Sequence, residues 1–270
     1  MKIRFRLKTL AGFVVLAAGL TVASVSADAT SAGSSTTCHG QQATIVGTAH
    51  DDSLIGTPGI DVVVLLDGDD FFDGLGGNDV VCGGDGQDLL VGGAGDDLLD
   101  GGASDDQLRG DLFSTTGDAT GDGGNDTLIC GDGNDDRASG DNLAPNGNAS
   151  GNGGDDRITA CERTTGDNLA GGLSVGDGGN DTIRGCSRCA ADNNSFSLQT
   201  AGTGGDDTVT GSSGPDAVVG DNEGAGGGGE DEISTLSGGD FIDGGPGTDR
   251  CNGGTGKDTT TNCETIVGVP

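Results

Sequence analysis

Apolar and polar positions repeat with a period of nine residues from Gly47 onward. Seven consecutive units fill residues 47–109, and in each of them the sixth residue is Asp and the eighth is apolar. Five of the seven units carry Gly at the fourth position. Positions seven to nine are often Leu, Val, Ile or Thr, which predicts a strand of about three residues whose middle side chain points inward. The pattern therefore predicts short strands separated by glycine-rich turns.

The same unit returns beyond residue 109 with interruptions. The breaks between blocks are not multiples of nine, which favours enlarged loops over decayed repeats, and most breaks begin with Gly-Asp, as at Gly110-Asp111 and Gly140-Asp141. In residues 130–138 this register places Asp135 at the sixth position and Arg137 at the eighth. In all, 17 units have Asp at position six.

One unit of nine residues cannot bury a core by itself, so we expect the units to stack into a solenoid. If each coil contains two units, successive turns alternate between two edges. One edge then carries Asp52, Asp70, Asp88 and Asp106, and the other carries Asp61, Asp79 and Asp97.

The first 27 residues have the pattern of a secretory signal peptide. Four basic residues within the first eight precede an apolar run from Leu10 to Val22, and small residues follow at 25–27. The apolar run is shorter than the roughly 20 residues that span a bilayer. We therefore expect cleavage rather than anchoring, and a secreted, extracellular mature chain.

Charge narrows the partners. The chain has 12 Lys and Arg against 44 Asp and Glu, and four of the basic residues lie in segment 1–27, which leaves 8 against 44, a formal charge of −36. All but five of the acids are Asp, the shorter residue, which suits turns and can direct a carboxylate at a backbone-lined site. Such a surface repels nucleic acid and anionic membranes. We expect no nucleic-acid partner, no stable membrane insertion and bound cations.

Composition alone is typical of disorder, because the chain has 58 Gly, high charge and no Trp or Tyr. A disordered chain has no reason to keep one register over seven units, so the periodicity excludes that interpretation.

The eight Cys of an exported chain favour disulfides. Cys186 and Cys189 form a CxxC with no βαβ pattern around it, which favours a structural disulfide over a redox site; a zinc site that includes Cys161 is the alternative. Further pairs to consider are Cys251 with Cys263, Cys38 with Cys82 and Cys130 with Cys161, and the connectivity stays open.

These units resemble the RTX, or haemolysin-type, calcium-binding repeat GGxGxDxUx, in which U is a large apolar residue. The resemblance covers about residues 45–261. It implies an all-β fold, a right-handed parallel β-roll (a β-solenoid) with irregular loop insertions, and several Ca²⁺ ions held by turn carbonyls and by the Asp carboxylates of units n and n+2. Complete GGxGxD matches occur at Gly83–Asp88, Gly92–Asp97, Gly226–Asp231, Gly244–Asp249 and Gly253–Asp258.

Oxygen ligands in flexible loops suit Ca²⁺ rather than Zn²⁺ or Mg²⁺. Carried over residue by residue, the resemblance implies neighbouring pairs such as Asp70/Asp88, Asp231/Asp249 and Asp240/Asp258. The isolated units around Asp156 and Asp181 contribute no candidate. The candidate metal ligands are Asp52, Asp61, Asp70, Asp79, Asp88, Asp97, Asp106, Asp126, Asp135, Asp207, Asp216, Asp231, Asp240, Asp249 and Asp258.

Catalytic motifs are missing from the sequence. Neither His39 nor His50 belongs to an HExxH motif, and no GxSxG elbow occurs. The predicted organisation leaves no room for a catalytic domain, so we expect no enzymatic activity. It comprises a signal peptide (1–27), an N-terminal cap (28–44), a β-roll (45–261, regular in 47–109 and 226–261, interrupted in 110–225) and a C-terminal cap (262–270).

The expected function is that of a calcium-binding protein whose folding is coupled to Ca²⁺ and whose role at the cell exterior is structural. One alternative is a calcium-dependent adhesin that uses the inserted loops to contact an extracellular surface or a polysaccharide. A less favoured alternative is an accessory module of a secreted toxin or hydrolase.

Overall fold

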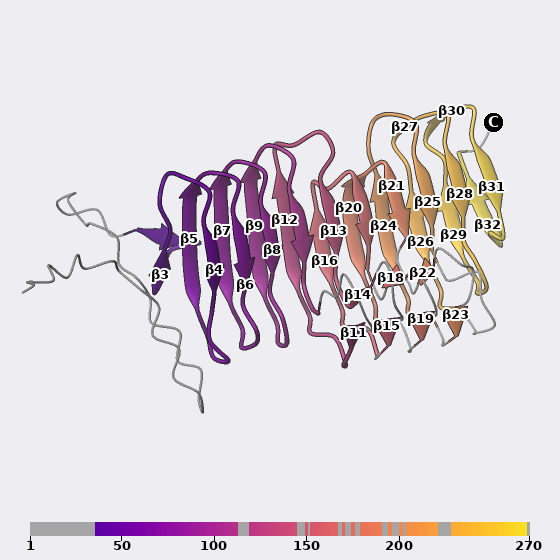
Figure 1. Ribbon diagram of the computed structural model, residues 1–270. Coiled ribbons are helices and arrows are strands. Elements are labelled where there is room, and N and C mark those ends of the chain that lie inside the picture. The colour runs from indigo at the N-terminus through magenta and orange to yellow at the C-terminus, as the bar shows by residue number, and fades with distance from the viewer. Residues whose placement is uncertain are drawn as a thin grey trace, which may run out of the picture.

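Two long parallel sheets face each other and run along the described chain (Figure 1). The computed structural model describes residues 36–112, 119–144, 149–150, 152–166, 169–170, 174–175, 179–190, 194–195, 200–201, 204–220 and 228–268. Within these residues one sheet has eleven strands, the other has ten, and no helix is present. Accordingly, the described part of the chain contains no helix that could cross a membrane. The expected signal peptide lies outside the described residues.

Both sheets are built from short strands in chain order. The eleven-stranded sheet contains β3 Ile45–Val46, β5 Val62–Asp67, β7 Val80–Asp85, β9 Leu98–Ala103, β12 Thr127–Gly131, β16 Arg157–Thr159, β20 Thr182–Cys186, β24 Thr208–Gly211, β26 Glu232–Ser234, β29 Arg250–Asn252 and β32 Thr265–Val267. The ten-stranded sheet contains β4 Ser53–Ile55, β6 Phe71–Asp73, β8 Leu89–Val91, β10 Gln107–Arg109, β13 Arg137–Ser139, β17 Arg163–Thr165, β21 Arg188–Ala190, β25 Ala217–Val219, β28 Phe241–Asp243 and β31 Thr259–Thr261.

The register confirms two nine-residue units per coil in the regular block. Val63 of β5 lies opposite Val81 of β7, and Phe72 of β6 lies opposite Leu90 of β8, so each step along a sheet is 18 residues. Successive units therefore alternate between the two sheets. The expected parallel β-roll is confirmed.

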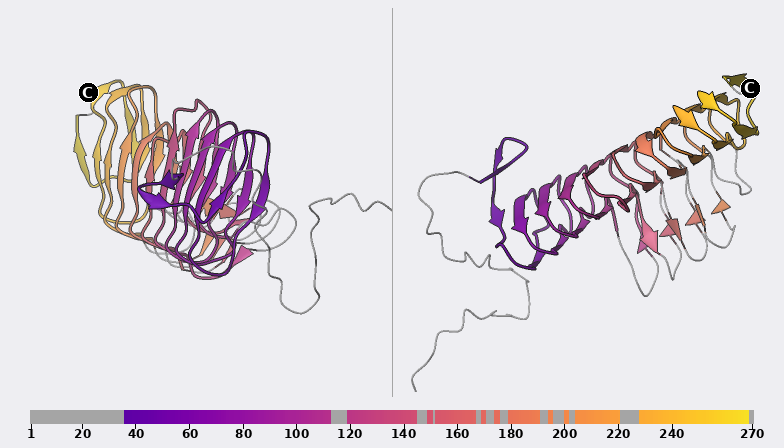
Figure 2. Two further views of the ribbon diagram at one scale, coloured as in Figure 1. Left: turned by 90° about the vertical axis from the view of Figure 1, so that its left-hand side faces the viewer. Right: turned by 90° about the horizontal axis from the view of Figure 1, so that it is seen from above.

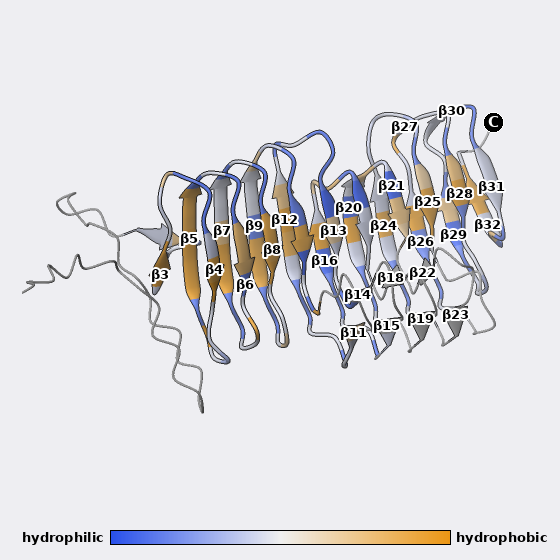
Figure 3. Ribbon diagram, in the orientation of Figure 1, coloured by the Kyte–Doolittle hydropathy of each residue, from blue (hydrophilic) through white to orange (hydrophobic). Residues whose placement is uncertain are grey.

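The core is a pair of facing columns of apolar side chains, one from each sheet. The middle residue of most strands points inward and is buried, as the period of two along a strand requires. In Figure 3 many strands of the two main sheets carry a hydrophobic segment, and most of the turns between them are hydrophilic. The fully buried residues of these columns are Val63, Val81, Leu99, Leu128, Ile158, Ile183, Val209, Ile233 and Cys251 on one side, with Phe72, Leu90, Leu108, Val218 and Ile242 on the other.

The interruptions are enlarged loops, as the spacing predicted, and the loops themselves stack. Four short strands from successive loops form a parallel sheet of their own, visible as a separate row beside the two main sheets (Figure 2). These strands are β11 Ala119–Thr120, β15 Ala149–Ser150, β19 Ser174–Val175 and β23 Thr200–Ala201. A three-stranded sheet accompanies them, made of β14 Leu143–Ala144, β18 Leu169–Ala170 and β22 Asn194–Ser195.

Short strands complete the two ends of the roll, and disulfides lie both at the ends and in the middle coils. The antiparallel strands β1 Thr37–Cys38 and β2 Gln41–Gln42 precede the roll, and β27 Ser237–Gly238 pairs with β30 Thr255–Gly256 near its end. All eight cysteines are bonded, which confirms the expected disulfides. The pairs are Cys38–Cys82, Cys130–Cys161, Cys186–Cys189 and Cys251–Cys263.

Candidate metal centres

The sixth-position aspartates directly precede strands and therefore stack wherever the strands stack. We call those before the eleven-stranded sheet the first Asp column and those before the ten-stranded sheet the second Asp column. The first Asp column contains Asp61, Asp79, Asp97, Asp126, Asp156, Asp181, Asp207, Asp231 and Asp249. The second contains Asp52, Asp70, Asp88, Asp106 and Asp136, and then Asp216, Asp240 and Asp258.

One oxygen of each carboxylate joins neighbouring coils. The backbone N–H of Asp70, for example, donates to Oδ1 of Asp88 at 2.9 Å, and that of Asp88 donates to Oδ1 of Asp106 at 2.8 Å. The same bond recurs along both columns at 2.7 to 3.1 Å. Through this bond between a backbone N–H and a carboxylate oxygen, the side chain fixes the register of one coil on the next.

The second oxygen, Oδ2, is left without a donor in most turns. At the first turn of each column a Thr amide satisfies it: Thr48 N–H donates to Asp52 Oδ2 at 2.6 Å, and Thr57 N–H donates to Asp61 Oδ2 at 2.7 Å. In many of the later turns this oxygen is buried and has no hydrogen-bond partner. The residues concerned are Asp70, Asp79, Asp88, Asp97, Asp106, Asp126, Asp156, Asp216, Asp240, Asp249 and Asp258.

Glycine brings a carbonyl oxygen close to several of these Oδ2 atoms. A Cβ on Gly83 would collide with both Asp88 Oδ2 and the carbonyl oxygen of Gly101 in the following coil. The same arrangement recurs at Gly92, where the two oxygens belong to Asp97 and Gly110. These turns therefore gather a carboxylate oxygen and a carbonyl oxygen around a space that the missing Cβ of glycine leaves open.

Burial makes the carboxylates costly to ionise without a counter-charge. It raises the pKa of Asp88 to about 6, of Asp79 and Asp106 to about 7, and of Asp97 to about 8. The backbone N–H bond to each Oδ1 opposes the rise, and the negative charge of the preceding Asp adds to it. A carboxylate with one buried, unpartnered oxygen needs a proton or a cation.

The donor set fits a hard cation. Carboxylate and carbonyl oxygens are the ligands that Ca²⁺ takes, and a flexible glycine turn suits its variable geometry better than the strict octahedron of Mg²⁺. The candidate ligand atoms described above are all oxygens. The unpartnered Oδ2 atoms and the glycine spaces therefore have the ligand chemistry that Ca²⁺ requires.

The structure corrects one candidate residue. Asp135 was expected at the sixth position, but Asp136 stands in the second Asp column and accepts the N–H of Asp106 at 2.8 Å. Gly131 of β12 lies opposite Gly102 of β9, but Asp136 follows Gly131 by five positions whereas Asp106 follows Gly102 by four. The turn therefore contains one extra residue, and the N–H groups of both Asn134 and Asp135 donate to Asp105 Oδ1. Asp135 instead pairs with Arg137 at 3.1 Å. The expected inward position of Arg137 is also wrong: its side chain is exposed and Ala138 is buried, which avoids burying a guanidinium.

Asp156 and Asp181, which the sequence interpretation omitted, belong to the first Asp column. The N–H of Asp126 donates to Asp156 Oδ1 at 2.8 Å, and that of Asp156 donates to Asp181 Oδ1 at 2.9 Å. Their spacings of 30 and 25 residues each correspond to one enlarged coil. An apolar strand residue two positions after each Asp, Ile158 and Ile183, is the sequence signal that identifies them.

The second Asp column is interrupted in the middle coils. After Asp136, the residues that precede strands β17 and β21 are Glu162 and Ser187. The hydroxyl of Ser187 donates to the carbonyl oxygen of Glu162 at 3.2 Å, so a local bond joins these coils. The column resumes at Asp216. The candidate centres are therefore continuous on one edge and divided into two blocks on the other.

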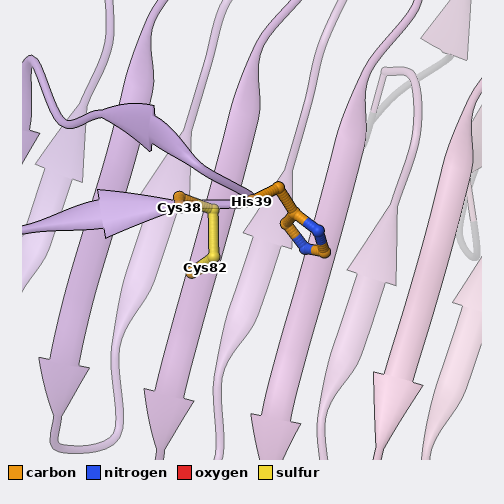
Figure 4. Close-up of side chains that lie close together, drawn as sticks. All are labelled: Cys38, His39 and Cys82. Carbon is orange, nitrogen blue, oxygen red and sulfur yellow. A yellow bond between two sulfur atoms is a disulfide. The ribbon is translucent and has the colours of Figure 1, made fainter.

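A different cluster at the N-terminal end is excluded as a metal site. Cys38, His39 and Cys82 lie close together, but the two sulfur atoms form a disulfide and the imidazole points away from it (Figure 4). His39 Nε2 lies 2.9 Å from Asp100 Oδ2, which ties the β1–β2 turn to strand β9.

Comparison with known proteins gives one match. Four segments of the chain, residues 46–81, 83–116, 201–222 and 225–260, match the family model of the RTX calcium-binding nonapeptide repeat. No curated protein and no solved structure matches the chain. The family model passes over residues 117–200, yet the first Asp column continues through them.

Proposed function

Because the chain belongs to the family of RTX calcium-binding nonapeptide-repeat proteins, whose repeats bind several Ca²⁺ ions, we propose that its folding is coupled to calcium and that it serves as a structural protein of the cell exterior. The ligands in this proposal are the two Asp columns. The repeat of this family is not catalytic. The proposal extends that property to the whole chain.

The buried, unpartnered Oδ2 atoms carry the proposal. A chain with a formal charge of −32 stacks its aspartates one above another, and Oδ1 of each is already used by the neighbouring coil. Without cations the remaining oxygens repel one another and the carbonyl oxygens beside them. The inward apolar columns are only one residue wide per strand, so their burial offers little to offset this repulsion. Calcium binding therefore supplies folding free energy.

Two features support a place outside the cell. The signal-like segment 1–27 directs export in the proposal. The four disulfides form and persist in oxidising compartments such as the extracellular space. Extracellular calcium is also in the range that flexible, carboxylate-rich modules bind, about 10⁻⁴ to 10⁻³ M.

A calcium titration of residues 28–270 followed by circular dichroism tests the coupling. At about pH 8, where the buried carboxyl groups are ionised, we expect the chelated protein to lack most of its β signal and to regain it cooperatively, with a midpoint near about 10⁻⁴ to 10⁻³ M Ca²⁺. Mg²⁺ at the same concentration is the control and should restore little signal, because its octahedral geometry does not fit the turns. An undiminished β signal in the chelated protein contradicts the coupling.

The adhesin alternative stays a prediction. It depends on the inserted loops at 112–121, 143–150, 168–176 and 190–201, most of which lie outside the described residues. The described parts of these loops form the small parallel sheets that contain β11 and β14. We therefore base no second function on them.

A further inference from the structure

Three arginines stack on the outer face of the ten-stranded sheet. Arg137 of β13 lies opposite Arg163 of β17, and Arg163 lies opposite Arg188 of β21. Neighbouring strands are about 4.8 Å apart, so one arginine follows another once per coil. We call Arg137, Arg163 and Arg188 the arginine ladder. It belongs to the middle coils, where β13 and β21 are labelled in Figure 1.

The arginine ladder contrasts with the composition of the chain. Beyond segment 1–27 only 8 basic residues accompany 44 acids, and six of those eight lie between residues 109 and 188. The first and third residues of β13, β17 and β21 face away from the core, because side chains alternate along a strand. None of these outward residues is acidic: they are Arg137, Ser139, Arg163, Thr165, Arg188 and Ala190.

The charge of the arginine ladder is compensated only in part. Asp135 lies 3.1 Å from Arg137 and 3.3 Å from Arg163, measured between carboxylate oxygens and guanidinium nitrogens, and all three side chains are nearly half exposed. Arg188 is exposed as well, and within the described part of the chain its guanidinium forms no ion pair. One carboxylate therefore serves three guanidinium groups.

The turns beside the ladder carry less negative charge than the other turns of that edge. In these coils the second Asp column passes from Asp136 to Glu162 and Ser187, and it resumes only at Asp216. The interruption of the column and the arginine ladder thus occupy the same coils. A strip of positive potential results on a molecule that is otherwise strongly negative.

Stability alone does not account for the ladder. Like charges directly opposite each other on neighbouring strands are destabilising, and exposed ion pairs such as those of Asp135 contribute little. Burial, and then the positive charge of Arg137, lowers the pKa of Arg109 in the neighbouring strand β10 to about 10. An anionic partner that contacts the exposed guanidinium groups would remove this repulsion.

The shape of the ladder selects a thin, linear anion. Arginine binds carboxylates and tetrahedral oxyanions through paired N–H···O bonds, and here the donors follow one line across three strands. Duplex nucleic acid carries one charge per about 1.7 Å, about three times the density of one arginine per about 4.8 Å, so its excess charge would face the acidic edges. A second copy of the chain would bring a further formal charge of −32. A polysaccharide with an acidic group on some or all of its sugars adds the least repulsion.

We propose that the arginine ladder binds a linear acidic polysaccharide along the outer face of the ten-stranded sheet. The acidic groups of the polymer face Arg137, Arg163 and Arg188, and the polymer follows the axis of the roll. This surface uses neither the calcium turns nor the inserted loops. It rests on the proposed function only for the location outside the cell, where such a polymer would be met.

Binding of lightly sulfated dextran to the disulfide-intact chain in saturating Ca²⁺, measured by calorimetry, tests the surface. Unmodified dextran has the same backbone without charge and should not bind. We expect Arg137→Gln, Arg163→Gln and Arg188→Gln combined to weaken binding about tenfold, because three exposed charge pairs each contribute modestly. Arg188→Gln alone breaks no ion pair and should weaken binding about two- to threefold, so it decides if the triple variant does not fold.

The matched control removes the same charge from the other sheet. Arg157, Arg184 and Arg250 are exposed on the eleven-stranded sheet, and Arg157 and Arg184 lie opposite threonines rather than arginines. Replacing all three with Gln should leave the binding of sulfated dextran nearly unchanged. If both triple variants weaken binding equally, the polymer responds to net charge and the ladder is not its site.

Further measurements separate other partners and the proposed function. Self-association in sedimentation that disappears in the ladder variant would assign the ladder to a second copy, and tighter binding of a short DNA duplex would assign it to nucleic acid; either result overturns the polysaccharide. Calcium content and β signal are measured on the same samples. If the ladder variants keep both and still bind sulfated dextran like the wild type, the ladder proposal is wrong and the proposed function stands. If chelation leaves the β signal intact, the calcium coupling is wrong, and binding in chelator then tests the ladder by itself.

Discussion

At the scale of single residues, the two oxygens of each column aspartate have different roles. Oδ1 accepts the N–H of the Asp one coil earlier, a bond of 2.8 Å between Asp61 and Asp79, and needs no metal. Oδ2 is buried without a partner in Asp79. Asn would keep an oxygen for the first role but would lose the negative charge of the second. Asp→Asn substitutions in the columns therefore separate coil register from cation binding.

The adjacent Asp135 and Asp136 offer a matched pair for this separation. We expect Asp136→Asn to weaken calcium binding at the Asp106 turn by about tenfold, which corresponds to about 1.4 kcal/mol. Asp135→Asn removes only exposed contacts with Arg137 and Arg163, worth roughly 0–1 kcal/mol, and should leave calcium binding unchanged. Calcium titration of the two variants side by side gives the measurement, and equal losses would show that the register of this turn is wrong.

This doublet also shows where sequence reasoning fails. Period and residue type predicted the Asp columns correctly where the units are contiguous, from Asp52 to Asp106. With two consecutive Asp and an Arg after them, either register satisfies the pattern, and only the cost of burying Arg137 decides. Asp156 and Asp181 were missed for another reason. Each lies one coil away from its neighbour in the column, but those coils are 30 and 25 residues long and are not multiples of nine.

At the scale of elements, the coil rather than the nonapeptide is the repeating unit. An enlarged loop lengthens a coil to as many as 30 residues, but the strands before and after it keep their places in the sheets. An exposed ladder supports this register without metal. Asn125 N–H donates to Asp96 Oδ1 at 3.0 Å, Asp155 N–H to Asn125 Oδ1 at 2.7 Å, and Asn180 N–H to Asp155 Oδ1 at 2.8 Å. Because Asp and Asn alternate, this ladder carries half the negative charge of a ladder made of Asp alone.

The last strand shows how an end is closed. β32 adds a strand to the eleven-stranded sheet beyond the final nonapeptide, and the side chain of Glu264 takes the place of a column Asp by accepting Asp249 N–H at 2.8 Å. The sequence predicts only a cap there, since the segment has neither the glycines nor the Asp of a unit. The Cys251–Cys263 disulfide joins the buried Cys251 of β29 to the segment that leads into β32. An otherwise open sheet edge is thereby fixed.

We expect that replacing both Cys251 and Cys263 with Ser frays the last two units. On the loop-entropy model a disulfide closing so short a segment is worth roughly 3 kcal/mol. The ion between Asp240 and Asp258 should be lost first, and residues 47–106 should keep theirs. Hydrogen exchange over a calcium series checks this, with Cys38→Ser plus Cys82→Ser as the control that should fray the opposite end. Uniform loss of protection along the whole roll would contradict a local role for the disulfide.

At the scale of the whole molecule, the roll combines a thin core with two edges of stacked negative charge. The first Asp column runs the length of the described roll, whereas the second is replaced by Glu162 and Ser187 in the middle coils. Those coils carry the Cys130–Cys161 and Cys186–Cys189 disulfides, and Asp135 bridges Arg137 and Arg163 of adjacent strands. In the coils where the second Asp column is interrupted, two disulfides and the exposed ion pairs of Asp135 therefore connect the chain. The overall architecture followed from the nine-residue period, but this division of the second edge did not.

The apo protein should lose stability as pH rises. Burial raises the pKa of Asp88 to about 6, of Asp79 and Asp106 to about 7 and of Asp97 to about 8, against an ordinary value of 3.8. Because the pKa values of these four carboxyl groups are raised in the folded state, the folded state binds more protons than the unfolded state between about pH 4 and about pH 8. The stabilisation is therefore complete below about pH 4 and is lost as pH rises through about 6 to 8.

In chelator, we accordingly expect a higher thermal midpoint of unfolding near about pH 5 than near about pH 8. In saturating Ca²⁺ we expect this difference to shrink or reverse, because the ion replaces the proton on the same carboxylates. Thermal unfolding followed by circular dichroism at both values, with free calcium fixed at each, measures the effect. The variant Asp97→Asn is the matched control, since an amide at the most strongly perturbed of these four positions should flatten the dependence in chelator. A midpoint in chelator that rises from pH 5 to pH 8 would mean that the column carboxylates are ionised and satisfied without calcium, and the coupling of folding to the ion would have to be abandoned.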